Sequence, residues 1–218
     1  MSYFTPIKHE VFKSDVSERI ELNWVNGKIV IDTKRANYSY GNLQKVLREG
    51  LKKIGFEQVR SLESALILGL GGGSVVKTLV DEIGFAGTII GIEYDPVMIG
   101  IGKKYFDLDK ITHLTIHQDD AFEFINRNTQ KVDLLIVDIF LDIFMPEFIF
   151  DEIFLSNLSK SLKVNGFLMF NTIIITKESA EKVKQLEQYF AMQEFNIQRF
   201  DHVIGDNNCL LIIQKISS

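Results

Sequence analysis

The feature that most constrains this chain is the alternation, after residue 64, of short apolar runs with amphipathic segments. The apolar runs predict strands at Ala65–Leu68, Thr88–Ile92, Thr112–Ile116, Val132–Val137 and Phe167–Phe170. The amphipathic segments predict helices near Val75–Ile83, Pro96–Tyr105, Ala121–Asn126, Phe148–Leu162 and Glu178–Met192. Strands that are apolar throughout are typical of a parallel sheet covered by helices on both faces. The sequence therefore predicts an α/β, doubly wound, Rossmann-like fold.

The two ends of the chain have a different pattern. Arg19–Val25 and Lys28–Thr33 alternate polar and apolar residues around an Asn-Gly turn signal, which predicts a small N-terminal β-hairpin. A helical pattern follows at Asn42–Ile54. Near the other end, Phe195–Phe200 and Cys209–Gln214 are joined by a link too short for a crossover helix, so they should pair as an antiparallel hairpin.

We therefore expect a mostly parallel, seven-stranded sheet that ends in this antiparallel hairpin. The predicted organisation is an N-terminal β-hairpin segment over residues 1–40 and an α/β domain over residues 41–218.

Charge and composition exclude several classes of function. The net charge is −5 and no basic stripe offsets it, so we expect no nucleic-acid partner. No apolar stretch approaches the roughly 20 residues of a membrane span, and the single cysteine, Cys209, lies in an apolar run. The four histidines lack metal-ligand spacing. We expect a cytoplasmic protein with no metal and no membrane partner; a homodimer is compatible with the sequence.

The densest chemical signal is a glycine-rich loop between the first apolar run and the next helix. Glycines there allow positive φ and let backbone amides approach a ligand, although a tight structural turn would use them too. Acidic residues follow later strands: Glu93 comes twenty residues after Gly73, and Asp120 and Asp138 follow the next two strands. An acid at the position of Glu93 can accept the ribose hydroxyls of a nucleoside.

Two other nucleotide sites fit less well. A phosphate-binding P-loop needs glycine immediately before Lys-Ser/Thr, whereas Val76 precedes Lys77. A dinucleotide site would place a pyrophosphate beside the acids that follow the strands, and acids are poor neighbours for it. An adenosine carrying a cationic sulfonium matches these acids better.

These motifs together resemble the class I S-adenosylmethionine-dependent methyltransferase superfamily, and within it the spermidine synthase-like branch. The resemblance runs from about Ile29 to Asn171. It implies S-adenosylmethionine, or its decarboxylated form, as the cofactor. It assigns cofactor binding to Gly69, Leu70, Gly71, Gly73, Glu93, Tyr94, Asp120, Ala121 and Asp138. It places Tyr40, Gln44 and Asp142 at the substrate.

Asp138 is the predicted catalytic residue, since a carboxylate beside an amine nucleophile can accept its proton. A purely cofactor-binding or helix-capping role for Asp138 is the alternative. The loop after it, Phe140-Leu-Asp-Ile-Phe144, is unusually apolar, and we expect it to cover the acceptor pocket.

Three positions depart from the polyamine synthase pattern. Gly72 replaces an aspartate of the loop, Asn42 stands where a glutamate is expected, and an apolar filling separates Asp138 from Asp142. We therefore rank methyl transfer to a small-molecule acceptor first. Polyamine aminopropyl transfer is the second hypothesis, and a non-catalytic nucleoside-binding protein is the third.

Overall fold

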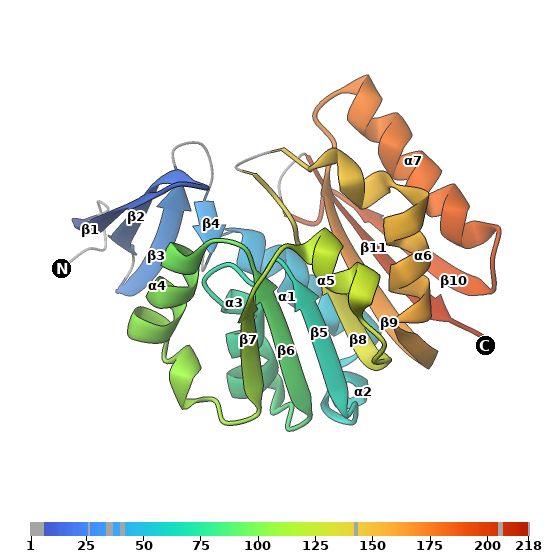
Figure 1. The fold of residues 1–218 in the computed structure, drawn as a ribbon, viewed down its shortest axis with the longest axis horizontal. Coiled ribbons are helices and arrows are strands. Elements are labelled where there is room, and N and C mark those ends of the chain that lie inside the picture. Colours follow the sequence, from blue (N-terminus) through green and yellow to red (C-terminus); the bar gives the residue numbers. More distant parts are fainter. Residues whose placement is uncertain are drawn as a thin grey trace.

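The computed structural model describes residues 7–25, 27–33, 37–39, 42–141, 144–204 and 207–217. Two sheets organise the chain (Figure 1). The larger sheet has seven strands in the order β10-β11-β9-β8-β5-β6-β7. Their bounds are β5 (Ser64–Leu68), β6 (Thr88–Glu93), β7 (Leu114–Gln118), β8 (Val132–Val137), β9 (Leu162–Ile173), β10 (Phe195–Asp201) and β11 (Asn208–Lys215).

The pairing of these strands confirms the predicted fold. β7, β6, β5, β8 and β9 pair in parallel, whereas β11 runs antiparallel to both β9 and β10. The predicted third strand lies two residues later than expected, because Thr112 and His113 precede β7.

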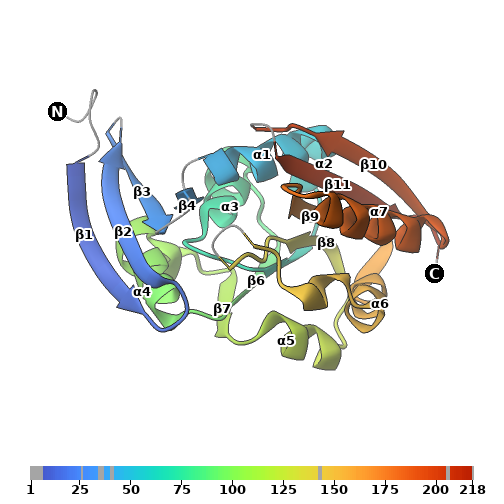
Figure 2. The same cartoon turned by 90° about the horizontal axis from the view of Figure 1, so that it is seen from above.

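Helices cover both faces of the sheet (Figure 2). They are α1 (Asn42–Ile54), α2 (Phe56–Arg60), α3 (Ser74–Lys77), α4 (Pro96–Phe106), α5 (Ala121–Arg127), α6 (Glu152–Lys160) and α7 (Lys177–Ala191). Successive residues of a strand point to opposite faces. Ala65 and Ile67 of β5 accordingly pack with side chains of α1 and α3, while Leu66 and Leu68 pack with those of α5, α6 and α7.

Two predicted helices differ from the structure. The helix expected at Val75–Ile83 is a four-residue α-helix followed by a π-helical segment, Thr78–Ile83. The helix expected at Phe148–Leu162 begins only at Glu152, after a short 3₁₀ turn, and ends at Lys160 because Leu162 already belongs to β9. Helical periodicity alone does not distinguish these variants from a regular helix.

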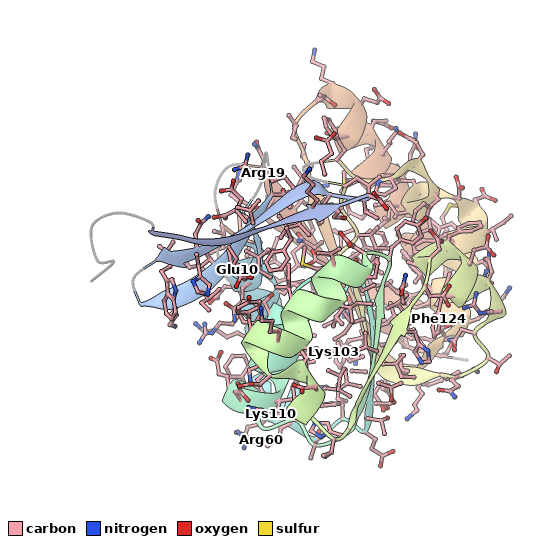
Figure 3. All side chains as sticks on the ribbon, turned by 60° about the vertical axis from the view of Figure 1, so that its left-hand side comes forward. Glu10, Arg19, Arg60, Lys103, Lys110 and Phe124 are labelled. Carbon is pink, nitrogen blue, oxygen red and sulfur yellow. The ribbon has the colours of Figure 1, made fainter. Side chains whose placement is uncertain are left out.

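The N-terminal hairpin belongs to a larger sheet of four antiparallel strands in the order β1-β2-β3-β4. These are β1 (Ile7–Ser14), β2 (Glu18–Val25), β3 (Lys28–Thr33) and β4 (Asn37–Ser39). The sheet lies across α4 (Figure 3). Ile20, Leu22 and Ile31 of the sheet pack against Met98 and Ile101 of that helix. The sequence predicted β2 and β3 but not their two neighbours. The division into residues 1–40 and 41–218 stays a prediction, because residues 40 and 41 lie outside the described part.

Candidate active site

The candidate site lies where the strand order of the large sheet reverses. β5 pairs with β6 on one side and with β8 on the other. The strands β6 and β7 therefore lie on one side of β5, and the next strands along the chain, β8 and β9, lie on its other side. Ligands of open α/β sheets bind in the crevice outside the carboxyl ends of the strands at such a point. The loops meet there through backbone hydrogen bonds: Gly69 N donates to Ile92 O at 3.0 Å, and Asp138 N donates to Leu68 O at 2.9 Å.

The glycine loop connects β5 to α3 in a conformation that other side chains would not tolerate. Gly69 has φ +86°, and a Cβ on it would lie 2.2 Å from the carbonyl oxygen of Asp138. Gly73 has φ +82°, and a Cβ there would lie 2.4 Å from Leu108. Leu70 is 3% exposed and its side chain packs under Gly91, so only its backbone is available to a ligand. The loop is therefore shaped by its neighbours before any ligand binds.

Glu93 ends β6 and holds the loop in place. Its Oε2 accepts a hydrogen bond from Gly71 N at 2.7 Å, and its Oε1 accepts one from Asp95 N at 2.9 Å. The side chain is buried, and this burial raises the pKa of Glu93, with the nearby Asp95 charge acting in the same direction. A carboxylate has about four acceptor positions, so Glu93 keeps capacity for ribose hydroxyls. Tyr94, the next residue, is exposed.

Asp120 lies after β7 and caps helix α5. Its Oδ1 accepts hydrogen bonds from Phe122 N at 2.8 Å and Glu123 N at 3.1 Å. Ala121 begins the helix, and its side chain packs on the apolar cluster of that face. Asp119 N donates to the carbonyl of Glu93, which ties the end of β7 to the end of β6. The contacts seen for Asp120 are those of a helix cap, and its adenine-binding role stays a prediction.

Asp138 follows β8 at the centre of the sheet. Its Oδ1 accepts a hydrogen bond from Asn171 Nδ2 at 2.8 Å. Desolvation among the strand ends raises the pKa of Asp138 to about 6, although the bond from Asn171 acts in the opposite direction. A carboxylate with this pKa is ionised near neutral pH and still accepts a proton readily.

In the loop after Asp138, the described residues Leu141 and Phe144 form an isolated bridge, and we refer to these two residues as the turn after Asp138. Leu141 and Phe144 exchange two backbone hydrogen bonds, of 2.9 and 3.0 Å, and their side chains are 54% and 57% exposed. Phe140 is buried, so it does not belong to this surface. Met145 Sδ accepts a weak hydrogen bond from Ile173 N at the end of β9, which holds the loop beside that strand.

The predicted substrate residues are only partly described. Tyr40 and Asp142 lie outside the described residues. Gln44, in the first turn of α1, donates a long hydrogen bond of 3.4 Å to Thr78 Oγ1, on the π-helical segment that follows the glycine loop and α3. A role for these three residues in substrate binding stays a prediction.

The sequence reasoning missed Asn171, which is fully buried on β9. Its Oδ1 has no hydrogen-bond partner among the described residues. The signal was present, because Asn171 is the first side-chain amide after the apolar run Phe167–Phe170 and so lies near the carboxyl end of a buried strand.

The described residues place two limits on the site. They contain no cluster of three or more histidine, cysteine or acidic side chains that could hold a metal ion. None of their helices is long and apolar enough to cross a membrane.

Comparisons with known proteins give this geometry a context. A model of the spermine/spermidine synthase domain matches residues 44–206. The polyamine aminopropyltransferase of Vibrio vulnificus is 33% identical over 118 residues, which cover 53% of this chain and 39% of the relative. A shorter match of 91 residues, 34% identical, joins 37% of this chain to 39% of ribose-5-phosphate isomerase A of Bifidobacterium longum. This chain therefore spans about two fifths of the length of these two relatives.

Among solved structures, a probable spermidine synthase from Corynebacterium glutamicum superimposes with a TM-score of 0.72. The alignment covers 98% of this chain and 81% of that one. At 17% sequence identity, this likeness supports the fold, including the N-terminal sheet, and not the activity.

Proposed function

The chain belongs to the spermine/spermidine synthase family, and we propose that it transfers an aminopropyl group from decarboxylated S-adenosylmethionine to an amine acceptor. The observation that carries this proposal is the position of Asp138. Its carboxylate has a pKa of about 6. The backbone of Asp138 is in contact with Gly69 of the glycine loop, and the same loop donates a hydrogen bond from Gly71 to Glu93.

The donor side of the site is suited to a nucleoside. Gly71, Glu93 and the amides of the loop lie in one hydrogen-bonded unit at the carboxyl ends of β5 and β6. Glu93 can accept the ribose hydroxyls, and Asp120 on the neighbouring strand end can accept the adenine amino group through the oxygen that does not cap α5.

Asp138 supplies the acid–base step of the proposed reaction. The acceptor nitrogen attacks the aminopropyl carbon that is bonded to sulfur, the carbon–sulfur bond breaks, and its electron pair stays on sulfur as methylthioadenosine forms. The attacking nitrogen must lose a proton, and the ionised Asp138 accepts it. Asn171 orients the carboxylate through its hydrogen bond to Oδ1.

This assignment reverses the ranking that the sequence motifs suggested, in which methyl transfer came first. Three departures favoured methyl transfer: Gly72 in place of an aspartate, Asn42 in place of a glutamate, and the apolar filling between Asp138 and Asp142. The match to the spermine/spermidine synthase domain spans residues 44–206 and favours aminopropyl transfer.

The two reactions leave different products, so one experiment separates them. The purified protein is incubated with either S-adenosylmethionine or its decarboxylated form, and with a panel of mono-, di- and polyamines. Chromatography with mass detection identifies the nucleoside product. We expect methylthioadenosine from the decarboxylated donor only. S-adenosylhomocysteine from the carboxylated donor would instead establish methyl transfer, and donor binding without either product would establish a non-catalytic protein.

A further inference from the structure

A continuous path of buried hydrogen bonds connects the N-terminal sheet to the glycine loop. Ser14, at the end of β1, donates its hydroxyl to Asp95 Oδ2 at 2.5 Å. The backbone N–H of Asp95 donates to Glu93 Oε1 at 2.9 Å, and Glu93 Oε2 accepts the N–H of Gly71 at 2.7 Å. The path therefore runs from the tip of the β1–β2 hairpin to the loop that would hold the donor.

Each member of this path is shielded from water. Asp95 is 2% exposed, Glu93 6% and Ser14 8%. Hydrogen bonds in such surroundings are stronger than in water, and the loss of one partner leaves a buried polar group unpaired. A change at one end of the path therefore reaches the other end.

The geometry restricts how Asp95 can respond. Its Oδ1 caps α4 by accepting Val97 N at 2.9 Å, while Oδ2 accepts the Ser14 hydroxyl and a longer bond, 3.2 Å, from Ser17. The Ser14 hydroxyl also accepts the backbone N–H groups of Val16 and Ser17, so the hairpin turn and the Asp95 carboxylate share one anchor. The backbone N–H of Asp95, which orients Glu93, is thus fixed from both sides.

We propose that Ser14 is a positioning residue for donor binding, which acts through Asp95 to hold Glu93 in the orientation that accepts the ribose hydroxyls. This inference rests on the proposed function, because it requires Glu93 to contact a nucleoside. The N-terminal sheet then contributes to the site without touching the ligand, and donor binding in turn stabilises the seating of the β1–β2 hairpin on α4.

A second anchor of the same sheet offers a matched control. Tyr105, in the last turn of α4, donates its hydroxyl to Glu10 Oε2 on β1 at 2.5 Å, and Figure 3 shows Glu10 beside this helix. This contact also holds β1 on α4, but among the described residues no hydrogen bond that involves it continues to Glu93. The Tyr105→Phe variant weakens the seating of the sheet and leaves the path from Ser14 intact.

The test measures binding by calorimetry with two probes, methylthioadenosine and its 2′-deoxy analogue. We expect Ser14→Ala to weaken methylthioadenosine binding about tenfold, and to weaken binding of the 2′-deoxy analogue much less. Ser14→Thr, which keeps the hydroxyl, should restore most of the affinity, and Tyr105→Phe should leave it unchanged. Hydrogen exchange of residues 9–25 should slow when methylthioadenosine is added to the wild type, but not when it is added to Ser14→Ala.

Several results would overturn the inference. Equal losses for the two probes, or an equal loss in Tyr105→Phe, would mean that Ser14 matters only for the seating of the sheet. Unchanged affinity in a folded Ser14→Ala protein, with a wild type that still prefers the ribose 2′-hydroxyl, would refute the positioning role and leave the proposed function intact. A wild type that binds neither probe would refute the proposed function and this inference with it.

Discussion

The two halves of the candidate site, which we propose bind the donor and the acceptor and call the donor half and the acceptor half, are built in opposite ways. In the donor half, Glu93 is buried and both its oxygens accept backbone N–H groups, and the glycine loop is fixed by its own packing. In the acceptor half, Asp138 receives a hydrogen bond from the Asn171 side chain, Asn171 Oδ1 has no partner within the described part of the chain, and Leu141 and Phe144 expose apolar surface. The first half is organised in advance, whereas the second keeps polar and apolar capacity for a partner.

This difference teaches where catalysis and specificity reside. Under the proposed function, a preorganised donor half would hold the sulfonium without rearrangement, which favours in-line attack. Asp138, the proposed proton acceptor, and the apolar side chains of Leu141 and Phe144 lie on the β8–β9 side, so changes there should alter turnover or acceptor choice and leave donor affinity nearly constant.

The largest expected effect breaks the acceptor half alone. Asp138→Asn removes the proton acceptor and keeps the shape of the side chain and its bond with Asn171. We expect the rate of aminopropyl transfer to fall by about 10³-fold, with donor affinity changed less than about threefold. Steady-state kinetics and calorimetry with methylthioadenosine measure the two quantities. A variant that keeps wild-type turnover would show that Asp138 is only a structural residue.

In the wild type the same assignment predicts how activity depends on pH. The ionised carboxylate is the active form, so kcat/KM should rise with pH and level off above about pH 6, the pKa of Asp138. The acid limb of this profile should be absent from the residual activity of Asp138→Asn.

The next effect couples the two halves, because Gly69 of the donor loop is in contact with the backbone of Asp138. A methyl group at Gly69 would lie 2.2 Å from Asp138 O and would occupy a positive φ. We expect Gly69→Ala to reduce the free energy of unfolding by about 4 kcal/mol. Gly84 is the control, since its φ is +75° but the nearest atom to its added Cβ is 3.7 Å away. Gly84→Ala should cost only about 1 kcal/mol in urea unfolding, and equal losses would contradict the close approach.

A smaller effect tests whether ionisation of the desolvated Asp138 lowers the stability of the folded state. The native pKa of Asp138 is about 6 and its ordinary value is 3.8, so the folded state holds the proton more tightly than the unfolded state. The resulting stability is fully present below pH 3.8 and is lost as the pH rises through 6. At pH 8 the wild type therefore bears a penalty of at most about 3 kcal/mol, which Asp138→Asn should remove.

Asp133, on the strand β8 that Asp138 follows, supplies a control of opposite sign. Burial acts to raise the pKa of Asp133, but hydrogen bonds from Lys163 and Ser64 outweigh it and lower the pKa. Asp133→Asn should therefore reduce stability at pH 8, and that loss should shrink as the pH falls to 3. Urea unfolding of both variants at pH 3.5 and pH 8 checks the two signs. A gain from Asp138→Asn that is equal at both pH values would exclude the electrostatic cause.

The strands and the glycine loop of the donor half were also the part that the sequence predicted well, whereas the donor-binding roles stay predictions. Its signals are local: glycines that need positive φ, apolar runs that fill a parallel strand, and an acid at the end of the next strand. Gly69 and Glu93 could be placed because Gly69 directly follows β5 and Glu93 ends β6, and a strand end fixes a position in space. The same local signals predicted β5, β6 and β8 to within one residue at each end.

What escaped prediction depends on contacts between distant segments. Asn171 reaches Asp138 only because β9 pairs with β8, and Ser14 reaches Asp95 only because the N-terminal sheet lies on α4. A pairing between residues 81 positions apart leaves no periodic trace in one sequence. The strand β1 was missed for the related reason that its register is set by β2 and α4 and not by its own pattern.

The smallest expected effect sharpens the comparison on the acceptor side. Phe144 is 57% exposed on the turn after Asp138, and Ile153 is 64% exposed on α6. If the turn covers the acceptor, Phe144→Ala should raise the acceptor KM by about three- to tenfold, the worth of partial burial of an aromatic ring against the acceptor. Donor KM should stay constant, and Ile153→Ala should change neither value.

Because both side chains are exposed in the free protein, a difference between them can come only from what binds beside Phe144. The rise in KM caused by Phe144→Ala should be largest for acceptors with longer alkyl chains, since they would bury more of the ring. If Phe144→Ala and the wild type have equal KM values for every acceptor of the series, the turn does not cover the acceptor.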